Sequence, residues 1–171
     1  MDTPREKEPN LVSEALKKLP KPWSEEAVIL AEYSAIDSSH WKFGLMQTLE
    51  NDKFASAIQK LSATAEVDNP FFKADFLAAA SKNLANGNVQ YLFLSEVIGG
   101  EENLHFFAPV VCERIGLFGI KVLKVWSHDY APLGEPLYRF DDPSRARDAL
   151  THCLETAKHP EFKTILLEFQ R

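Results

Sequence analysis

The sequence predicts an α/β domain in which a mixed, largely antiparallel sheet is flanked by helices. Three observations favour this class. Stretches with apolar residues at helical spacing alternate along the chain with short runs typical of strands, in the order strand, helices, antiparallel strands, helix, strand. Glycine pairs separate consecutive strands in the middle of the chain, as tight turns do. The length of 171 residues, 45% of them hydrophobic, is enough for one core without disulfides or a structural metal.

Charge and composition exclude several classes of function. The formal net charge of -6 argues against a nucleic-acid partner, because binding phosphates needs clustered Lys and Arg. The longest uncharged apolar stretch, 106–112, is far too short to span a bilayer, and no secretory leader is recognisable at the N-terminus. Two cysteines suit a reducing compartment. These features predict a cytoplasmic protein without a membrane span.

The chain is expected to begin with a disordered, charged tail over 1–22, followed by a single domain over 23–171. The tail has four prolines, nine charged residues and few apolar ones. Such a segment cannot offset its ordering entropy by burial.

The first expected element of the domain is a strand over 27–33, which contains a run of four apolar residues. A turn over 34–39 follows. Trp41, Leu45 and Leu49 then recur at four-residue spacing, which predicts a helix, although Gly44 weakens that prediction.

Two further helices are expected, over 54–65 and 73–86. Phe54, Ile58 and Leu61 share one face of the first, and Asn69-Pro70 separates it from the second.

The middle of the chain changes to strands. The run 89–98 is apolar on both alternating faces, as in an interior strand of a covered sheet. A hairpin loop over 99–103 leads to a partner strand over 104–114, where Pro109 predicts a bulge or an edge because proline cannot donate to a ladder. Another turn, at Gly116 and Gly119, precedes a strand over 120–126.

The clearest predicted element is a fourth helix, with Asp142 as N-cap and Pro143 in its first turn. The next strand is expected over 164–169. If it pairs with the strand over 120–126, the helix between them forms a right-handed parallel crossover. The expected apolar stripe of the helix consists of Ala146, Ala149, Leu150, Cys153, Leu154 and Ala157.

Motifs for cofactors and metals are absent. The sequence contains no Walker pattern and no Gly-x-Gly-x-x-Gly, and its five histidines show no His-x-x-x-His pair. No cofactor or metal site is therefore expected. Cys112 and Cys153 are interpreted as small core residues, and the paired aromatic residues as core rather than as an acyl pocket.

The best candidate for a binding residue lies in the loop after the strand over 120–126. His128 could act as a general base, oriented by Asp129 or Tyr130, because loops at strand ends often carry functional groups. The alternative is an ordinary capped turn, since neighbours in a loop need not face one another.

Four segments resemble the CelD-like family of GNAT-related acetyltransferases, named for cellulose biosynthesis. They occur in the family's order: FASAIQKL at 54–61, NPFFKADFL at 69–77, FFAPV at 106–110 and SHDYAPL at 127–133. The resemblance implies a GNAT-like lobe. The GNAT pyrophosphate signature, Gln or Arg-x-x-Gly-x-Gly or Ala, is missing, because the glycine after Arg114 comes one residue too early.

This resemblance implies the N-terminal, acceptor-side lobe of an acyltransferase that lacks the coenzyme-binding lobe and is inactive alone. Acetyl-CoA is then implied only for a complete two-lobe protein, and the partner is a second lobe or a second copy. No catalytic residue of the family can be assigned, and 128–130 is the expected acceptor contact. A non-catalytic assembly module that pairs through an exposed sheet edge is the main alternative, and a complete small GNAT enzyme with an unrecognisable coenzyme loop is a weaker one.

Overall fold

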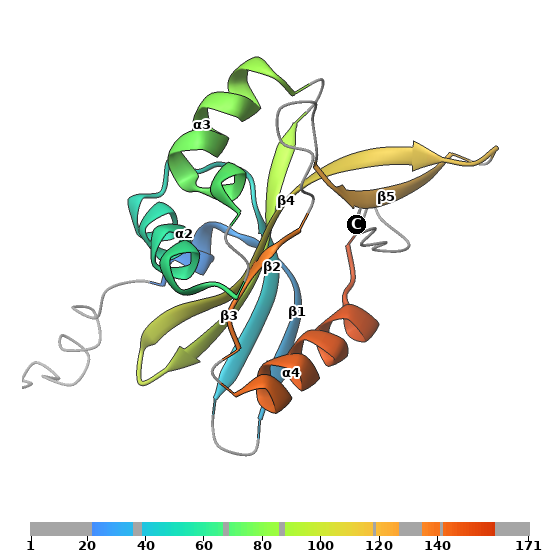
Figure 1. Cartoon of the computed structure of the whole chain (residues 1–171). Helices are drawn as coiled ribbons and strands as arrows, with labels where there is room; N and C mark the ends of the chain where they lie inside the picture. Colours follow the sequence, from blue (N-terminus) through green and yellow to red (C-terminus); the bar gives the residue numbers. More distant parts are fainter. Residues whose placement is uncertain are drawn as a thin grey trace, which may run out of the picture.

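The predicted α/β class is confirmed by the structure, a computed structural model, in which one curled sheet carries helices on its faces (Figure 1). The residues that the structure describes are 22–35, 39–66, 69–85, 88–117, 119–126, 135–140 and 142–159. The tail before residue 22, the 128–130 loop and the expected strand over 164–169 lie outside them, as do parts of the expected turns. The predicted boundary between tail and domain therefore stays a prediction.

The sheet has six strands in the order β1-β2-β3-β4-β5, and β6 pairs with β4 on the same side as β5. Every pairing among the described strands is antiparallel. The parallel crossover expected from the sequence depends on residues 164–169, so it remains untested. The strands are β1 Val28–Ser34, β2 His40–Met46, β3 Val89–Ile98, β4 Glu101–Ile115, β5 Ile120–Val125 and β6 Leu137–Tyr138.

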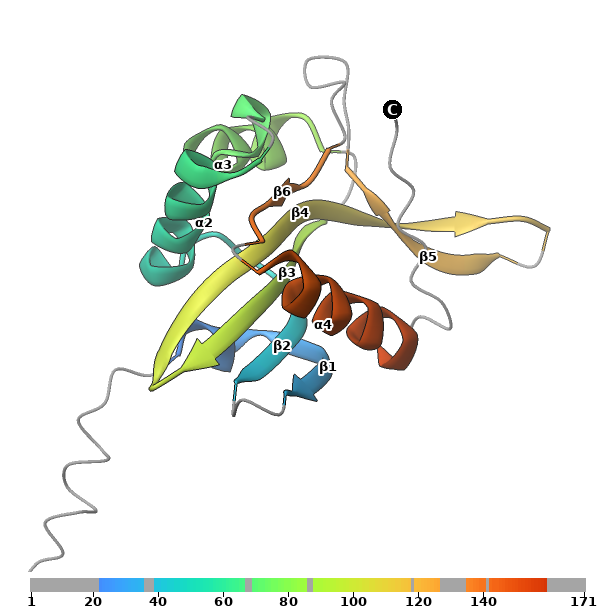
Figure 2. The same ribbon diagram turned by 60° about the horizontal axis from the view of Figure 1, so that its bottom comes forward.

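Helices cover the sheet on opposite sides (Figure 2). Phe54 of α2 packs against Phe93 of β3 and Phe107 of β4, with ring centroids 6.1 and 6.0 Å away. α4 packs on β1 and β2. Both faces of the central strands are therefore apolar, as the sequence predicted for β3. The helices are η1 Trp23–Glu26, α2 Asp52–Thr64, η2 Pro70–Phe72, α3 Ala74–Asn83 and α4 Pro143–Thr156.

The helix predicted from Trp41, Leu45 and Leu49 is wrong, because His40–Met46 forms strand β2 between β1 and β3. A spacing of four residues fits a strand as well as a helix, since four is a multiple of the strand period of two. Gly44 is needed where β2 passes close to β1 and Phe93. A Cβ there would lie 2.8 Å from a carbonyl oxygen of β1 and 2.9 Å from the Phe93 ring, so only glycine allows this close approach.

The β3–β4 hairpin is tighter than predicted. Its turn is only Gly99-Gly100, both with positive φ, and pairing resumes at Glu101. Pro109 lies neither in a bulge nor on an outer strand. One edge of β4 pairs with β3, and the other pairs first with β6 and then with β5. On that second edge Pro109 falls between the residues paired with β6 and those paired with β5. No ladder hydrogen bond is needed from its nitrogen at that gap. The bulge lies instead at His105, the extra residue between the Leu94–Phe106 and Ser95–Leu104 pairs.

Helix α4 begins as predicted. The Asp142 side chain accepts hydrogen bonds from the backbone N–H groups of Ser144 and Arg145, which fixes the first turn. The prediction that Leu154 belongs to the buried stripe is wrong, because its side chain is 37% exposed. Leu150 and Ala157 are half-buried. The fully buried stripe residues are Ala146, Ala149 and Cys153.

The remaining core predictions have mixed outcomes. The paired aromatic residues are mainly core, as expected, with Phe72, Phe93, Phe106 and Phe107 all buried. Cys112 is exposed rather than buried, because β4 leaves the body of the protein before it reaches this residue. Strand β6 was not predicted, since its two residues have no pattern of their own. No helix in the described part of the chain is long and apolar enough to cross a membrane.

Candidate functional site

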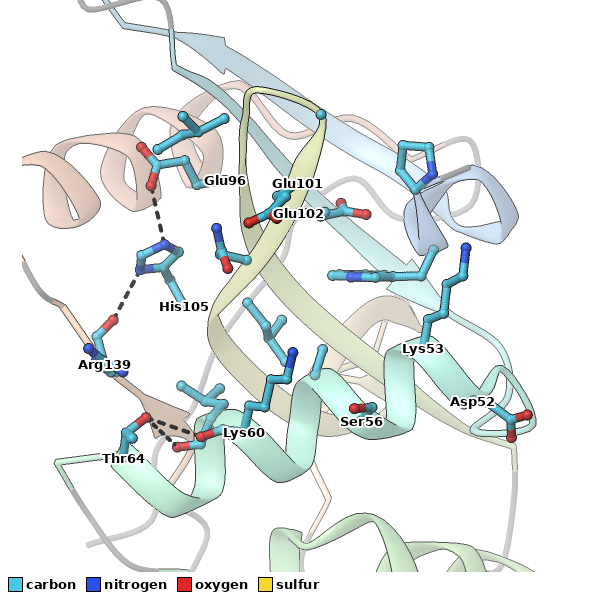
Figure 3. Close-up of a pocket in the computed structure, with 18 residues that line it drawn as sticks. Asp52, Lys53, Ser56, Lys60, Thr64, Glu96, Glu101, Glu102, His105 and Arg139 are labelled. Atoms are coloured by element: carbon cyan, nitrogen blue, oxygen red, sulfur yellow. Dashed lines mark hydrogen bonds and ion pairs between the residues drawn. The ribbon is translucent and has the colours of Figure 1, made fainter. Parts of the chain in front are cut away.

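A cleft of about 890 Å³ separates α2 from the β3–β4 hairpin (Figure 3). One end is bounded by Trp23 of η1, and the other by Arg139, which follows β6. The two long walls come from segments that the sequence places far apart. Tertiary packing therefore creates this cleft, and polar side chains line most of it.

The α2 wall is the polar face of an amphipathic helix. Asn51 caps the helix, since its side-chain oxygen accepts from the N–H groups of Lys53 and Phe54 at 3.1 Å each. This cap fixes where the helix begins and therefore which of its side chains face the core. Phe54 is one of these and is fully buried. Lys53, Ser56 and Lys60 consequently share the face that lines the cleft, and the two lysines rise from α2 toward the hairpin (Figure 3).

The hairpin wall is acidic and held in place by hydrogen bonds. Ser95 Oγ donates to Glu102 Oε1 at 2.7 Å, and the Ser24 backbone N–H donates to Glu102 Oε2 at 3.1 Å. Glu102 thereby ties the hairpin to η1. Glu101, the first residue after the turn, is exposed at the mouth of the cleft.

A buried group of charges forms the inner part of this wall. The Glu96 side chain is only 7% exposed, and its two carboxylate oxygens face Arg145 and His105. Oε1 accepts from Arg145 Nη2 of α4, and Oε2 lies 3.4 Å from His105 Nε2. Trp41 packs beneath both partners, with its ring 4.9 Å from that of His105 and 5.9 Å from the Arg145 guanidinium carbon. We call Trp41, Glu96, His105 and Arg145 the buried charge cluster.

His105 helps to form the wall of the cleft. Its Nδ1 lies 3.2 Å from the Arg139 carbonyl oxygen, and its Nε2 lies 3.4 Å from Glu96 Oε2. Through these two contacts His105 joins β4 to β3 and to the segment after β6.

The walls of the cleft carry charges of both signs. Lys53, Lys60 and Asp52 stand on α2, and Glu101 and Glu102 stand on the hairpin (Figure 3). A polar ligand with a cationic and an anionic end can be held between such walls. Among the residues that the structure describes, no group of three or more His, Cys, Asp and Glu side chains is arranged to hold a metal ion.

The predicted contact residues His128, Asp129 and Tyr130 lie outside the described residues, so their prediction stands untested. Cys153 is fully buried, as predicted. Burial, together with the negative charge of Glu32, raises the pKa of its thiol to about 11. This thiol is protonated at neutral pH and does not serve as a nucleophile.

Sequence reasoning missed Glu96 and His105. A signal for them existed, because each is a polar residue in an otherwise apolar strand, and the Gly99-Gly100 turn places the two strands side by side. A charged residue that interrupts an apolar interior strand needs a partner. Arg145 gave no such signal, since it lies on the fourth helix among other charged residues.

No protein-family model matches this chain, and no curated protein is significantly similar to it.

Proposed function

We propose that this chain is the acceptor-side lobe of a CelD-like, GNAT-related acyltransferase and that its cleft forms one wall of the acceptor site. The cleft between α2 and the hairpin is the observation that carries the proposal. The α/β fold, with its curled antiparallel sheet, is compatible with such a lobe. A second lobe would then hold acetyl-CoA and supply the pyrophosphate loop that this sequence lacks.

Acyl acceptors are amines or alcohols, and the charged walls suit a polar molecule of this kind. An ammonium group is attracted by Glu101, and an anionic group by Lys60. The buried charge cluster keeps the inner wall rigid, so the acceptor would meet a preformed surface. His105 is part of that wall.

The proposal is tested by titrating the isotope-labelled chain with glucosamine and with n-butylamine while backbone amide chemical shifts are recorded. Shifts are expected at Ser56, Lys60 and Glu101, which line the cleft. Ser56→Trp should abolish them by filling the space. Gln59→Trp is the matched control, because Gln59 is exposed on the same helix but does not line the cleft.

Calorimetry supplies the complementary test. The chain by itself should not bind acetyl-CoA, because the coenzyme site belongs to the second lobe. Tight binding of acetyl-CoA would refute the division into lobes, and amide shifts that avoid the cleft would refute its assignment as the acceptor site.

A second candidate is a non-catalytic assembly module that pairs through a sheet edge. Among the described strands, β5 pairs on one side only, and such edges tend to add another strand. Light scattering coupled to size exclusion tests this candidate. A dimer at micromolar concentration would support it, and a monomer throughout that range would contradict it.

A further inference from the structure

The end of β4 and the start of β5 form a two-stranded arm whose tip extends away from the body of the protein (Figures 1 and 2). Its tip is apolar and uncovered. Leu117, at the turn, is 102% exposed. Ile115 and Ile120, which pair with each other across the two strands, are 41% and 49% exposed. Single exposed apolar residues are common, but three together at the end of a protruding arm indicate a contact surface.

Charge on the arm changes sharply at one level. Arg114 and Lys121 are cross-strand partners, and the six residues from Ile115 to Ile120 carry no charge. The arm end over 113–124 has three cations against one anion, Glu113, although the chain as a whole carries -6. The Arg114 side chain lies along the tip and reaches its turn, since Nη1 would be 3.6 Å from a Cβ on Gly119. We call Arg114 and Lys121 the cationic collar of the apolar tip.

One backbone hydrogen bond closes the turn of the tip. Gly116 and Gly119 have positive φ, and the Gly119 N–H donates to the Gly116 carbonyl oxygen at 3.1 Å. Ile115 and Ile120 pair in the ladder directly below. Each such bond lowers the cost of moving the tip into a medium of low polarity.

We propose that this tip inserts into the surface of a bilayer that contains anionic phospholipids, with Ile115, Leu117 and Ile120 among the acyl chains and the Arg114 and Lys121 side chains bound to lipid phosphates. The combination of apolar side chains with two neighbouring cations favours an anionic lipid surface as the partner. The tip extends roughly 5–7 Å beyond the collar, at about 3.4 Å per residue. That length matches the roughly 5–10 Å depth of interfacial insertion. Contact between the tips of two copies is disfavoured, because their collars would repel each other.

The experiment measures co-sedimentation of the full chain with vesicles of phosphatidylcholine and phosphatidylglycerol in equal amounts, and with vesicles of phosphatidylcholine alone. The chain should bind the anionic vesicles, bind the neutral ones much less, and lose binding as salt is raised. Leu117→Ser should weaken binding by about tenfold or more, the contribution of one leucine transferred from water. Leu117 packs against nothing, so the fold should be unaffected, and circular dichroism checks this.

Leu154→Ser is the matched control, because Leu154 is another exposed leucine, on α4, far from the collar in sequence. It should bind as the unmodified chain does. The double change Arg114→Gln and Lys121→Gln should remove the preference for anionic lipid. The proposal is overturned if the unmodified chain does not bind anionic vesicles, or if Leu117→Ser binds equally well. It is also overturned if the chain ignores vesicles and self-associates through a contact that Leu117→Ser abolishes.

Discussion

Glu96→Gln is the most informative change to the buried charge cluster, because it removes one charge and keeps the size of the side chain. The Glu96 side chain is 7% exposed, and its partners His105 and Arg145 are 11% and 37% exposed. Breaking a buried ion pair by neutralising one member costs about 3–5 kcal/mol. Arg145 is partly exposed and can turn toward water. The expected loss in the free energy of unfolding is therefore at the lower end, about 3 kcal/mol.

Urea unfolding followed by tryptophan fluorescence and circular dichroism measures this loss. With a urea dependence of roughly 1–3 kcal/mol per molar, the midpoint should fall by about 1–3 M, and the slope should not change. Glu113→Gln is the matched control. It makes the same chemical change in a surface ion pair, in which Lys124 Nζ lies 3.8 Å from Glu113 Oε2. The Glu113 side chain is 47% exposed and that of Lys124 29%. That variant should lose less than about 1 kcal/mol.

The reasoning is refuted if Glu96→Gln unfolds within about 1 kcal/mol of the unmodified chain, the range typical of surface pairs. A double-mutant cycle with Arg145→Gln separates the pair from its surroundings. Strong coupling is expected, because both residues belong to one cluster. Additive losses would mean that the pair contributes little.

Three further predictions concern stability and reactivity. Cys112 should react rapidly with Ellman's reagent, while Cys153, buried and with its pKa raised to about 11, should react only after unfolding; equal rates in the folded chain would contradict this. Asp142 has a lowered pKa, mainly because the Ser144 hydroxyl donates a hydrogen bond to its carboxylate. The ionised carboxylate therefore stabilises the fold at pH values above the ordinary pKa of 3.8, and this contribution is lost as the pH falls through the lowered pKa of the folded state. Asp142→Asn keeps a side chain that can cap the helix but removes the charge. Its melting temperature should differ from that of the unmodified chain at neutral pH, and the difference should vanish in acid. A difference that stays constant with pH would contradict this prediction. Gly44→Ala should destabilise by about 1–3 kcal/mol in urea unfolding, because its Cβ would meet a carbonyl oxygen at 2.8 Å, and an unchanged midpoint would show that β1 moves aside freely.

Most elements of the fold could be predicted because their signals are local. Asn51 and Asp142 cap their helices through bonds to residues two and three positions away. The turn at Gly99-Gly100 and the one at Gly116 and Gly119 need positive φ, which glycine supplies. The error at His40–Met46 has the same origin, because a local spacing of four residues cannot distinguish the two periods. Pairing with β1 and β3 decides that this segment is a strand.

The cleft could not be predicted, because its two walls meet only in the folded chain. Glu96 and Arg145 are 49 residues apart, and the bulge that inserts His105 into β4 has no sequence mark beyond the residue itself. The cleft exists because α2 packs on one face of the sheet while the hairpin extends past it.

The sequence by itself determined the α/β class and most helices and turns, since each depends on residues close together in the chain. Tertiary structure alone decided that the 40–46 segment is a strand, that Cys112 is exposed, and that Glu96 faces Arg145 and His105 beside a cleft. The physical reason is that burial and pairing of charge depend on which distant segments share a surface, and the order of residues records that only indirectly.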